Sequence, residues 1–269
     1  MKNKMIRAGV VQFDTRLGDT ETNIRSALAG IQELADLKAD IAVLPELWPA
    51  GFDNANMAFQ AARAPHIVEV MTSWALEHRM VIAGSIAEAD GSRIYNTLVV
   101  IDKDGRVAGR YRKIHLFSPS GENRYFAGGD ARVVCETAAG RLGLMICYDL
   151  RFPELCRALA LNDAQCVIVP AQWPTPRIDQ WEILLKARAL ENQLFVLGAN
   201  RCGQDPGMAY GGGSRIVSPR GETLALAPAD GPRVLCADLD RSVMEDFRNQ
   251  IPCFRDRVPQ SYGTPKGES

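Results

Sequence analysis

The sequence predicts an α/β layered domain with a partly antiparallel pair of sheets. Short apolar runs of strand character alternate with segments of helical spacing along the whole chain. Several strand runs are almost continuously apolar, as expected where both faces of a sheet are covered. Two turn sequences, DKDG at Asp102–Gly105 and SPRG at Ser218–Gly221, join strand pairs. These hairpins favour layered sheets over a simple doubly wound sheet.

The strand candidates are short runs rich in apolar residues. In chain order they are Ile6–Phe13, Ile41–Leu44, Met80–Ser85, Thr97–Ile101, Arg132–Glu136, Leu142–Cys147, Cys166–Val169, Leu194–Ala199, Arg215–Ser218 and Val234–Asp238. Between them, apolar residues recur at helical spacing, as expected for helices that cover a sheet with one face. The predicted helices are Thr22–Leu37, His66–His78, Pro153–Leu161, Ile178–Glu191 and Ser242–Phe247.

Length and composition fit one large domain. A chain of 269 residues with 46% hydrophobic content can bury a substantial core. Its net charge of −1 does not indicate the excess of basic residues that is typical of nucleic-acid-binding proteins. No run approaches the length of a membrane span, and the apolar stretch in MKNKMIRAGVVQF is too short and interrupted for a signal peptide. We therefore expect no nucleic-acid partner and no membrane association.

The cysteines indicate a reducing compartment. Their number, seven, is odd, and their spacing forms no disulfide framework. Four of them (Cys135, Cys147, Cys166 and Cys236) lie in apolar, strand-like runs. This pattern is typical of reduced thiols, so a cytoplasmic location is predicted.

Three segments place a reactive side chain where an apolar run breaks. Cys147 lies in the segment LGLMICYDLRFPE, Glu46 follows the apolar run of IAVLPELW, and Lys113 lies in GRYRKIHLF. Strand ends in α/β proteins are where active sites are built. A thiol, a carboxylate and an ammonium at such ends form a plausible catalytic set.

Each of these residues also has an ordinary structural explanation. A cysteine in an apolar strand is usually a packed thiol, and Glu46 after a proline could be a turn acid. Lys113 lies in a basic run that is typical of a solvated face, and Glu122 lies in a polar loop. The polar break directly after Cys147 favours the catalytic interpretation. The joint occurrence of a thiol, a carboxylate and an ammonium where apolar runs break also favours it.

Together the segments resemble the signature of the nitrilase superfamily, the carbon–nitrogen hydrolases with a Glu–Lys–Cys triad. The resemblance runs from IRAGVVQFD near the N-terminus to IPCFRDRVPQSY near the C-terminus. It implies Glu46 as general base, Lys113 as electrophilic stabiliser and Cys147 as nucleophile. The family often carries a second glutamate shortly after the lysine, and Glu122 in SPSGENRYFAGG matches it.

The resemblance also implies an architecture. Subunits of this family are four-layer αββα sandwiches that dimerise through helices, and the C-terminal tail crosses the interface. By this resemblance residues 1–269 form a single domain, and residues 250–269 form a C-terminal interface arm. A second copy of the chain is thus an expected partner.

The chemistry of such a triad follows from the thiol. A free thiol has a pKa of about 8.5 and is mostly protonated at neutral pH. Attack on an amide therefore needs a base beside the sulfur, which Glu46 can supply, or a cation that lowers its pKa, which Lys113 can supply. The backbone N–H of Tyr148 would complete an oxyanion hole, and one such donor is worth about 3–4 kcal/mol. Ammonia or an amine would leave, and water would hydrolyse the thioester.

Substrate-binding candidates flank the predicted nucleophile. PAQWPTPR follows another strand, so Trp173 and Arg177 are predicted to line the pocket. Arg151 and Asp149 follow Cys147 and are expected to anchor its loop by pairing with each other. Either arginine could hold a substrate carboxylate with two hydrogen bonds, and Arg177 is the preferred one. The three histidines show no metal-ligand pattern, so neither a metal nor another cofactor is expected.

The substrate branch is suggested by two further segments. YDLRFPE and ARALENQ (Ala187–Gln193) are similar to the branch of omega-amidases, which cleave the terminal amide of small substrates such as 2-oxoglutaramate. Tyr148 stands where nitrilases generally carry a tryptophan, which disfavours a nitrile. N-carbamoyl amino acid amidohydrolases, nitrilases and an inactive scaffold relative remain as alternatives.

Other classes of hydrolase and redox protein fit less well. A papain-like enzyme needs a histidine after the cysteine, and the last histidine is His115. A caspase-like order with His115 lacks the surrounding signature. No GxSxG or CxxC sequence occurs, which disfavours a serine α/β-hydrolase and a thiol–disulfide oxidoreductase.

Overall fold

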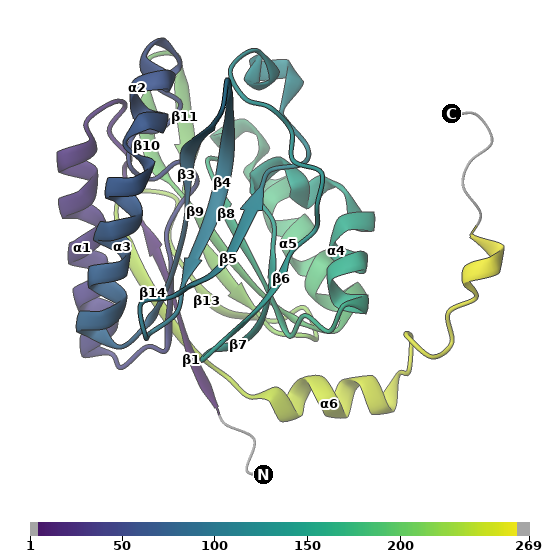
Figure 1. Cartoon of the computed structure of the whole chain (residues 1–269). Coiled ribbons are helices and arrows are strands. Elements are labelled where there is room, and N and C mark those ends of the chain that lie inside the picture. Colours follow the sequence, from purple (N-terminus) through teal and green to yellow (C-terminus); the bar gives the residue numbers. More distant parts are fainter. Residues whose placement is uncertain (1–4, 263–269) are drawn as a thin grey trace.

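Two six-stranded sheets lie face to face with helices on both outer faces, which gives four layers (Figure 1). The computed structural model describes residues 5–262. The strand order is β14-β1-β2-β3-β4-β5 in the first sheet and β13-β12-β9-β8-β7-β6 in the second. The predicted α/β layers, with helices outside two partly antiparallel sheets, are confirmed.

The first sheet is parallel at its centre and antiparallel at both sides. Its strands are β1 (Ile6–Gln12), β2 (Ile41–Val43), β3 (Val81–Asp90), β4 (Arg93–Ile101), β5 (Val107–Arg112) and β14 (Arg233–Leu239). The parallel neighbours β1, β2 and β3 are connected through the helices α1 (Thr20–Asp36), α2 (Met57–Ala62) and α3 (Ala64–His78). Successive residues of a strand point to opposite faces, so Val10 packs between the sheets and Val11 packs under α1 and α3.

The second sheet is built in the same way. Its strands are β6 (Val134–Thr137), β7 (Gly140–Leu144), β8 (Cys166–Ala171), β9 (Phe195–Asn200), β12 (Arg215–Val217) and β13 (Thr223–Leu226). The parallel strands β7, β8 and β9 are connected by α4 (Pro153–Leu161) and α5 (Ile178–Asn192), which cover the outer face. A separate hairpin consists of β10 (Cys202–Asp205) and β11 (Met208–Gly211).

The structure corrects one prediction that bears on the site. The apolar run that was predicted as a strand to Cys147 leaves the sheet at Leu144, and Cys147 begins a 3₁₀ turn, Cys147–Arg151. The other predicted strands and helices are present with shifted ends, and α4 has the predicted bounds. Short α2 and the β10–β11 hairpin were not predicted, because neither carries a clear apolar period.

The C-terminal part of the described chain leaves the layered body. Helix α6 (Arg241–Gln250) buries Met244 and Phe247, and the chain then runs outward through a short 3₁₀ turn at Pro259–Ser261 (Figure 1). Residues 263–269 of the predicted arm lie outside the described residues. Within residues 5–262, no helix is both long and apolar enough to cross a membrane.

Candidate active site

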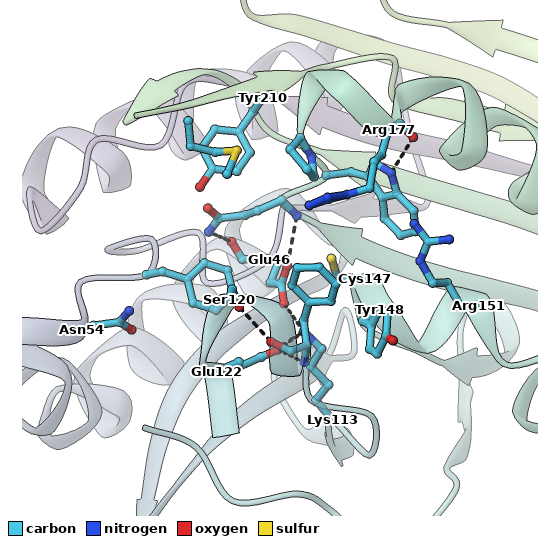
Figure 2. A pocket seen from close by; sticks show the side chains of 16 residues that line it. Glu46, Asn54, Lys113, Ser120, Glu122, Cys147, Tyr148, Arg151, Arg177 and Tyr210 are labelled. Atoms are coloured by element: carbon cyan, nitrogen blue, oxygen red, sulfur yellow. Dashed lines mark hydrogen bonds and ion pairs between the residues drawn. The ribbon is translucent and has the colours of Figure 1, made fainter. Parts of the chain in front are cut away.

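The carboxyl ends of strands from both sheets meet around one cavity of about 150 Å³ (Figure 2). Glu46 follows β2, Lys113 follows β5, and Cys147 follows β7. All three line the cavity, as does Glu122. Its other lining residues are Phe52, Asn54, Phe117, Ser120, Tyr148, Arg151, Gln172, Trp173, Pro174, Arg177, Met208 and Tyr210. The fold therefore brings together every residue that the sequence analysis placed in the site.

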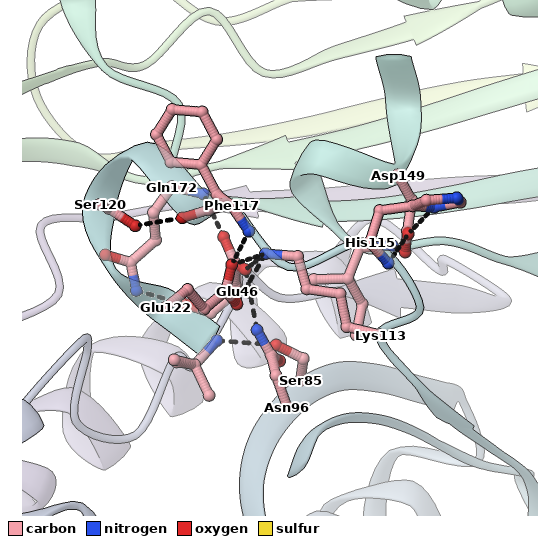
Figure 3. A network of polar contacts seen from close by, with 12 residues as sticks. Glu46, Ser85, Asn96, Lys113, His115, Phe117, Ser120, Glu122, Asp149 and Gln172 are labelled. Atoms are coloured by element: carbon pink, nitrogen blue, oxygen red, sulfur yellow. Dashed lines mark hydrogen bonds and ion pairs between the residues drawn. The ribbon is translucent and has the colours of Figure 1, made fainter. Parts of the chain in front are cut away.

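Glu46 is fully buried and held by hydrogen bonds on both carboxylate oxygens (Figure 3). Oε1 accepts from Lys113 Nζ at 2.8 Å and from Asn96 Nδ2 at 2.8 Å, and Oε2 accepts from the backbone N–H of Gln172 at 3.0 Å. Burial, with a contribution from Glu122, raises the pKa of Glu46 although Lys113 lowers it. A carboxylate with a raised pKa is a stronger proton acceptor than one on the surface.

Lys113 points inward, although its neighbours in the basic run lie at the surface. Its Nζ donates to Glu46 Oε1 at 2.8 Å and to both carboxylate oxygens of Glu122 at 2.9 Å. Burial alone lowers the pKa of Lys113, but the two carboxylates outweigh it and raise the pKa, so the amine stays charged. Arg110 and Arg112 instead form ion pairs on the outside of the sheet.

Glu122 holds Lys113 from the side away from Glu46. It begins the 3₁₀ turn Glu122–Arg124 and is buried. Its Oε2 also accepts from the backbone N–H of Phe117 at 2.6 Å, which fixes the carboxylate against the loop that lines the cavity. The geometry thus places Glu122 as a support for the lysine.

Cys147 adopts a left-handed backbone conformation with φ +47°, which is uncommon for a residue other than glycine. The turn that it begins is anchored by buried Asp149, whose Oδ2 accepts from the Ile146 N–H at 2.9 Å and from the Tyr111 hydroxyl at 2.7 Å. Asp149 Oδ1 accepts from the backbone N–H of His115 at 3.0 Å. The strained conformation therefore persists because its surroundings fix it.

The expected pairing of Asp149 with Arg151 is wrong. Asp149 binds residues that follow β5, whereas Arg151 Nη2 donates to Gln180 Oε1 of α5 at 2.6 Å. The anchoring role expected for Asp149 is present, but its partners are Ile146 beside it and, from the other sheet, Tyr111 and His115. The nucleophile turn is in this way tied to the segment that carries Lys113.

The surroundings of Cys147 favour the neutral thiol over the thiolate. Burial, followed by the adjacent Glu46 carboxylate, raises its pKa well above the usual value, and Lys113 lowers it by less. The lysine therefore does not by itself produce a thiolate. Attack requires transfer of the thiol proton, and Glu46 is the carboxylate whose charge acts most strongly on the thiol.

Tyr148 is the second residue of the nucleophile turn. N–H groups in the first turn of a helical segment have no acceptor within the helix, so the Tyr148 N–H is suited to bind an oxyanion. The ring packs edge-on against Phe117 at 4.9 Å and Phe152 at 5.3 Å between centroids. These contacts hold the turn in place.

The predicted substrate-binding residues all line the cavity, with Arg177 across from Lys113 and Arg151 at the side (Figure 2). Trp173 is buried, and its Nε1 donates to the carbonyl of Arg177 at 2.7 Å. The Arg151 guanidinium lies over the Trp173 ring at 4.9 Å, and that of Arg177 lies over Phe117 at 5.3 Å. Among the described residues, the Arg177 guanidinium has no hydrogen-bond or ion-pair partner, so it is available to an anion.

Several residues of the site escaped the sequence analysis. Asn96 and Gln172 bind Glu46, and Met208 and Tyr210 come from the unpredicted hairpin. Gln172 directly follows β8 in PAQWPTPR, and this position at a strand end could have identified it as a site residue. Among the described residues, no group of histidine, cysteine, aspartate and glutamate side chains is arranged to hold a metal ion.

Comparison with known proteins finds similarity to carbon–nitrogen hydrolases, including amidases. The sequence model of the family described as carbon-nitrogen hydrolase matches residues 7–249. The 2-oxoglutaramate amidase of Bacillus subtilis is 36% identical over 91% of this chain and 95% of its own length. The omega-amidase YafV of Escherichia coli K12 is 37% identical over 81% of this chain and 84% of its own length.

One solved structure is informative about the cysteine. It is a glutamate-to-glutamine mutant of the amidase from Nesterenkonia sp. AN1, with the acetamide moiety of fluoroacetamide covalently added at the active-site cysteine. Its fold matches with a TM-score of 0.86 at 26% identity, over 97% of each chain.

Proposed function

The chain belongs to the carbon–nitrogen hydrolase family, and from this premise we propose that it hydrolyses the terminal amide of a small carboxylate-bearing substrate through a thioester on Cys147. That the chain is an amidase follows from its family and its amidase relatives. The observation that carries the proposal for the residues is that a buried carboxylate, Glu46, accepts a hydrogen bond from Lys113 at 2.8 Å and lines the same cavity as the Cys147 thiol.

The first half of the reaction forms the thioester. Glu46 takes the thiol proton as Cys147 Sγ attacks the amide carbon. The oxygen that becomes negative is held by the Lys113 ammonium and the Tyr148 N–H. Glu46 then gives the proton to the amide nitrogen, the C–N bond breaks and ammonia leaves. The raised pKa of Glu46 suits both transfers, because the group must accept and release a proton near neutral pH.

The second half releases the acid. Water loses a proton to Glu46 and attacks the thioester carbon, and the same two donors hold the negative oxygen. The C–S bond breaks, the acid leaves and Cys147 regains its proton. Lys113 keeps its charge while Glu46 is protonated, because the Glu122 carboxylate stays beside it at 2.9 Å and raises its pKa.

The substrate class follows from the size and charge of the cavity. A volume of about 150 Å³ admits only a small molecule. The site carries two carboxylates and one ammonium, those of Glu46, Glu122 and Lys113, whereas Arg177 lies across the cavity from Lys113 and Arg151 at its side. A substrate with its amide at Cys147 and a carboxylate at Arg177 fits this arrangement of charged groups. The amide-cleaving relatives agree with this choice.

Ammonia release from a panel of substrates tests the proposed function. The panel contains ω-amides of small dicarboxylates, neutral amides of equal length, N-carbamoyl amino acids and matched nitriles. We expect the highest kcat/KM for a carboxylate-bearing ω-amide. Faster turnover of an N-carbamoyl amino acid or a nitrile would replace the proposed substrate, and no turnover of any member would favour an inactive scaffold.

Arg177→Ala should separate binding of the carboxylate from the chemistry. We expect KM to rise strongly for the carboxylate-bearing amide and much less for a neutral amide of the same length, because only the former loses a charge-assisted bidentate contact. The kcat for the charged substrate falls too if that contact orients the amide. Equal effects on both substrates would contradict the assignment of Arg177.

We also propose that the chain is a homodimer, assembled through α4, α5 and the C-terminal arm within residues 250–269. Leu161, Ile183 and Leu190 are exposed apolar side chains on these two helices, and Ile251 is exposed at the start of the arm. Light scattering at micromolar concentration should give about twice the 29.5 kDa of one chain. A mass near that of one chain would contradict the dimer.

A cytoplasmic location is the remaining part of the proposal. All seven cysteines are free, and Cys253 is exposed. Free thiols of this kind persist in a reducing compartment. Fractionation of cells that express the full chain should recover it with cytoplasmic markers.

A further inference from the structure

One fully buried arginine, Arg201, lies behind the cavity and has no part in the chemistry described above. It follows β9 directly, and its side chain is 0% exposed. Nη1 donates to Asp205 Oδ2 at 2.8 Å and Nη2 donates to the carbonyl of Thr15 at 2.7 Å. Asp14 Oδ1 lies 3.2 Å from Nη2, so two carboxylates balance the buried charge.

The same guanidinium reaches the general base through one residue. Nη1 also donates to Gln172 Oε1 at 3.0 Å. The other end of that amide, Nε2, donates to the backbone carbonyl of Glu46 at 2.8 Å, while the backbone N–H of Gln172 donates to Glu46 Oε2 at 3.0 Å. Arg201 thereby fixes Gln172, whose side chain holds the backbone of Glu46 and whose backbone N–H holds its carboxylate.

On its other side Arg201 holds the substrate-facing hairpin. Its guanidinium lies 4.0 Å from the centre of the Tyr210 ring, and the Tyr210 hydroxyl donates to Asp205 Oδ2 at 3.2 Å. Tyr210 and Met208 of β11 both line the cavity. The hairpin lies so close to Asp14 that a Cβ at Gly203 would come within 2.1 Å of Asp14 Oδ1.

We propose that Arg201 is a positioning residue that keeps the base Glu46 and the hairpin wall of the cavity in one fixed arrangement. This inference rests on the proposed function, because it assumes that Glu46 moves the protons. The role requires arginine, since a planar fork of five donors can serve acceptors on separate segments at once, whereas the ammonium of lysine offers three donors at one point.

Arg201→Lys and Gln172→Met test the two links. For Arg201→Lys we expect kcat/KM to fall about 10²-fold, the usual cost of a small misplacement, with a lower kcat and a higher KM. Gln172→Met should lower kcat with a smaller effect on KM, because the hairpin stays in place. In both variants the backbone N–H of residue 172 is no longer held in place against Glu46 Oε2, and this weaker hydrogen bond stabilises ionised Glu46 less. The acid limb of the pH profile should therefore move to higher pH. The double variant should have no lower kcat than Arg201→Lys alone.

Arg215→Lys is the matched control. Arg215 is also buried and paired with a carboxylate, Glu182, at 2.9 Å, but it does not line the cavity. We expect this variant to lower the Tm and leave KM and the pH profile unchanged. If Arg201→Lys behaves in the same way, Arg201 is structural only and the proposal is wrong. Additive losses of kcat in the double variant would also overturn it.

A second readout does not depend on amide turnover. Alkylation of Cys147 by iodoacetamide also requires loss of the thiol proton to Glu46, and peptide mass spectrometry follows it at that residue alone. Arg201→Lys and Gln172→Met should both move its pH dependence to higher pH. A wild-type enzyme that hydrolyses no amide would overturn the proposed function, whereas unchanged alkylation profiles in both variants would overturn the role of Arg201. If Arg201→Lys does not fold, Gln172→Met carries the alkylation test alone, because its side chain lies between Arg201 and Glu46.

Discussion

Replacing Cys147 with alanine should abolish amide hydrolysis and leave the fold intact. The substitution removes the atom that forms the covalent intermediate, so no thioester route remains. The lost packing is small, because the residue is partly exposed and lies in a turn that Asp149 anchors independently. Ammonia release measures the first effect and thermal unfolding the second. Activity above about 1% of wild type would contradict the nucleophile assignment, given the usual size of nucleophile effects.

Cys253→Ala is the matched control for this substitution. Cys253 is the exposed cysteine, lies after α6 and does not line the cavity. Because Cys253 lies in the proposed interface arm, the comparison is of activity alone, and this variant should retain the wild-type kcat. A loss of activity in this variant would mean that the assay responds to thiol removal in general.

Lys113→Arg should be severely impaired although it keeps the positive charge. Three carboxylate oxygens lie within 2.9 Å of the Lys113 amine in a site where its side chain is 1% exposed. The wider guanidinium cannot occupy that position without displacing Glu46 or Glu122. We expect kcat to fall about 10²–10³-fold, as for loss of an oxyanion donor. Substrate-dependent borohydride trapping on Lys113 would instead indicate Schiff-base chemistry.

Lys103→Arg provides the comparison for that variant. Lys103 is exposed in the turn between β4 and β5, one strand before Lys113. The same chemical change there should leave kcat and KM unchanged. If Lys113→Arg also retained wild-type kcat, the compact ammonium would have no catalytic role.

Much of the fold was predictable because the apolar residues in the sequence are the ones that the structure buries. The strands β8 and β9 are apolar throughout, because a sheet covers one face and helices cover the other. Helix α4 begins at Pro153, a residue favoured in the first turn, and its bounds were predicted fully. The β7 end was misjudged because Met145 and Ile146 continue the apolar run after the strand has left the sheet.

The hairpin of β10 and β11 could not be recognised in the same way. Its sequence, CGQDPGMAYG, offers glycines and a turn but no apolar alternation. Its position depends on contacts with distant segments, including Asp14, Phe13 and Trp173. Such tertiary contacts override local preference and leave no periodic signal.

The sequence predicted the reactive residues of the site and part of its wall, since Tyr148, Arg151, Trp173 and Arg177 line the cavity as expected. Glu46, Lys113 and Cys147 stand where apolar runs break, and their order resembles a known family. Asn96 and Gln172 are ordinary polar residues in the sequence, and their role arises because two sheets bring them to the same carboxylate. The sign of the thiol's pKa shift likewise depends on burial, which outweighs the effect of Lys113.

The central claim is that hydrolysis passes through an acyl-enzyme on Cys147. It is tested most directly by measuring how this intermediate divides between two acceptors, water and hydroxylamine. An amide and a methyl ester of the same acid are each hydrolysed in the presence of a fixed concentration of hydroxylamine, and the ratio of hydroxamate to free acid is measured. If both substrates pass through the same thioester, the leaving group has departed before the ratio is set, and the two ratios should be equal. Ratios that depend on the leaving group would contradict a shared thioester intermediate.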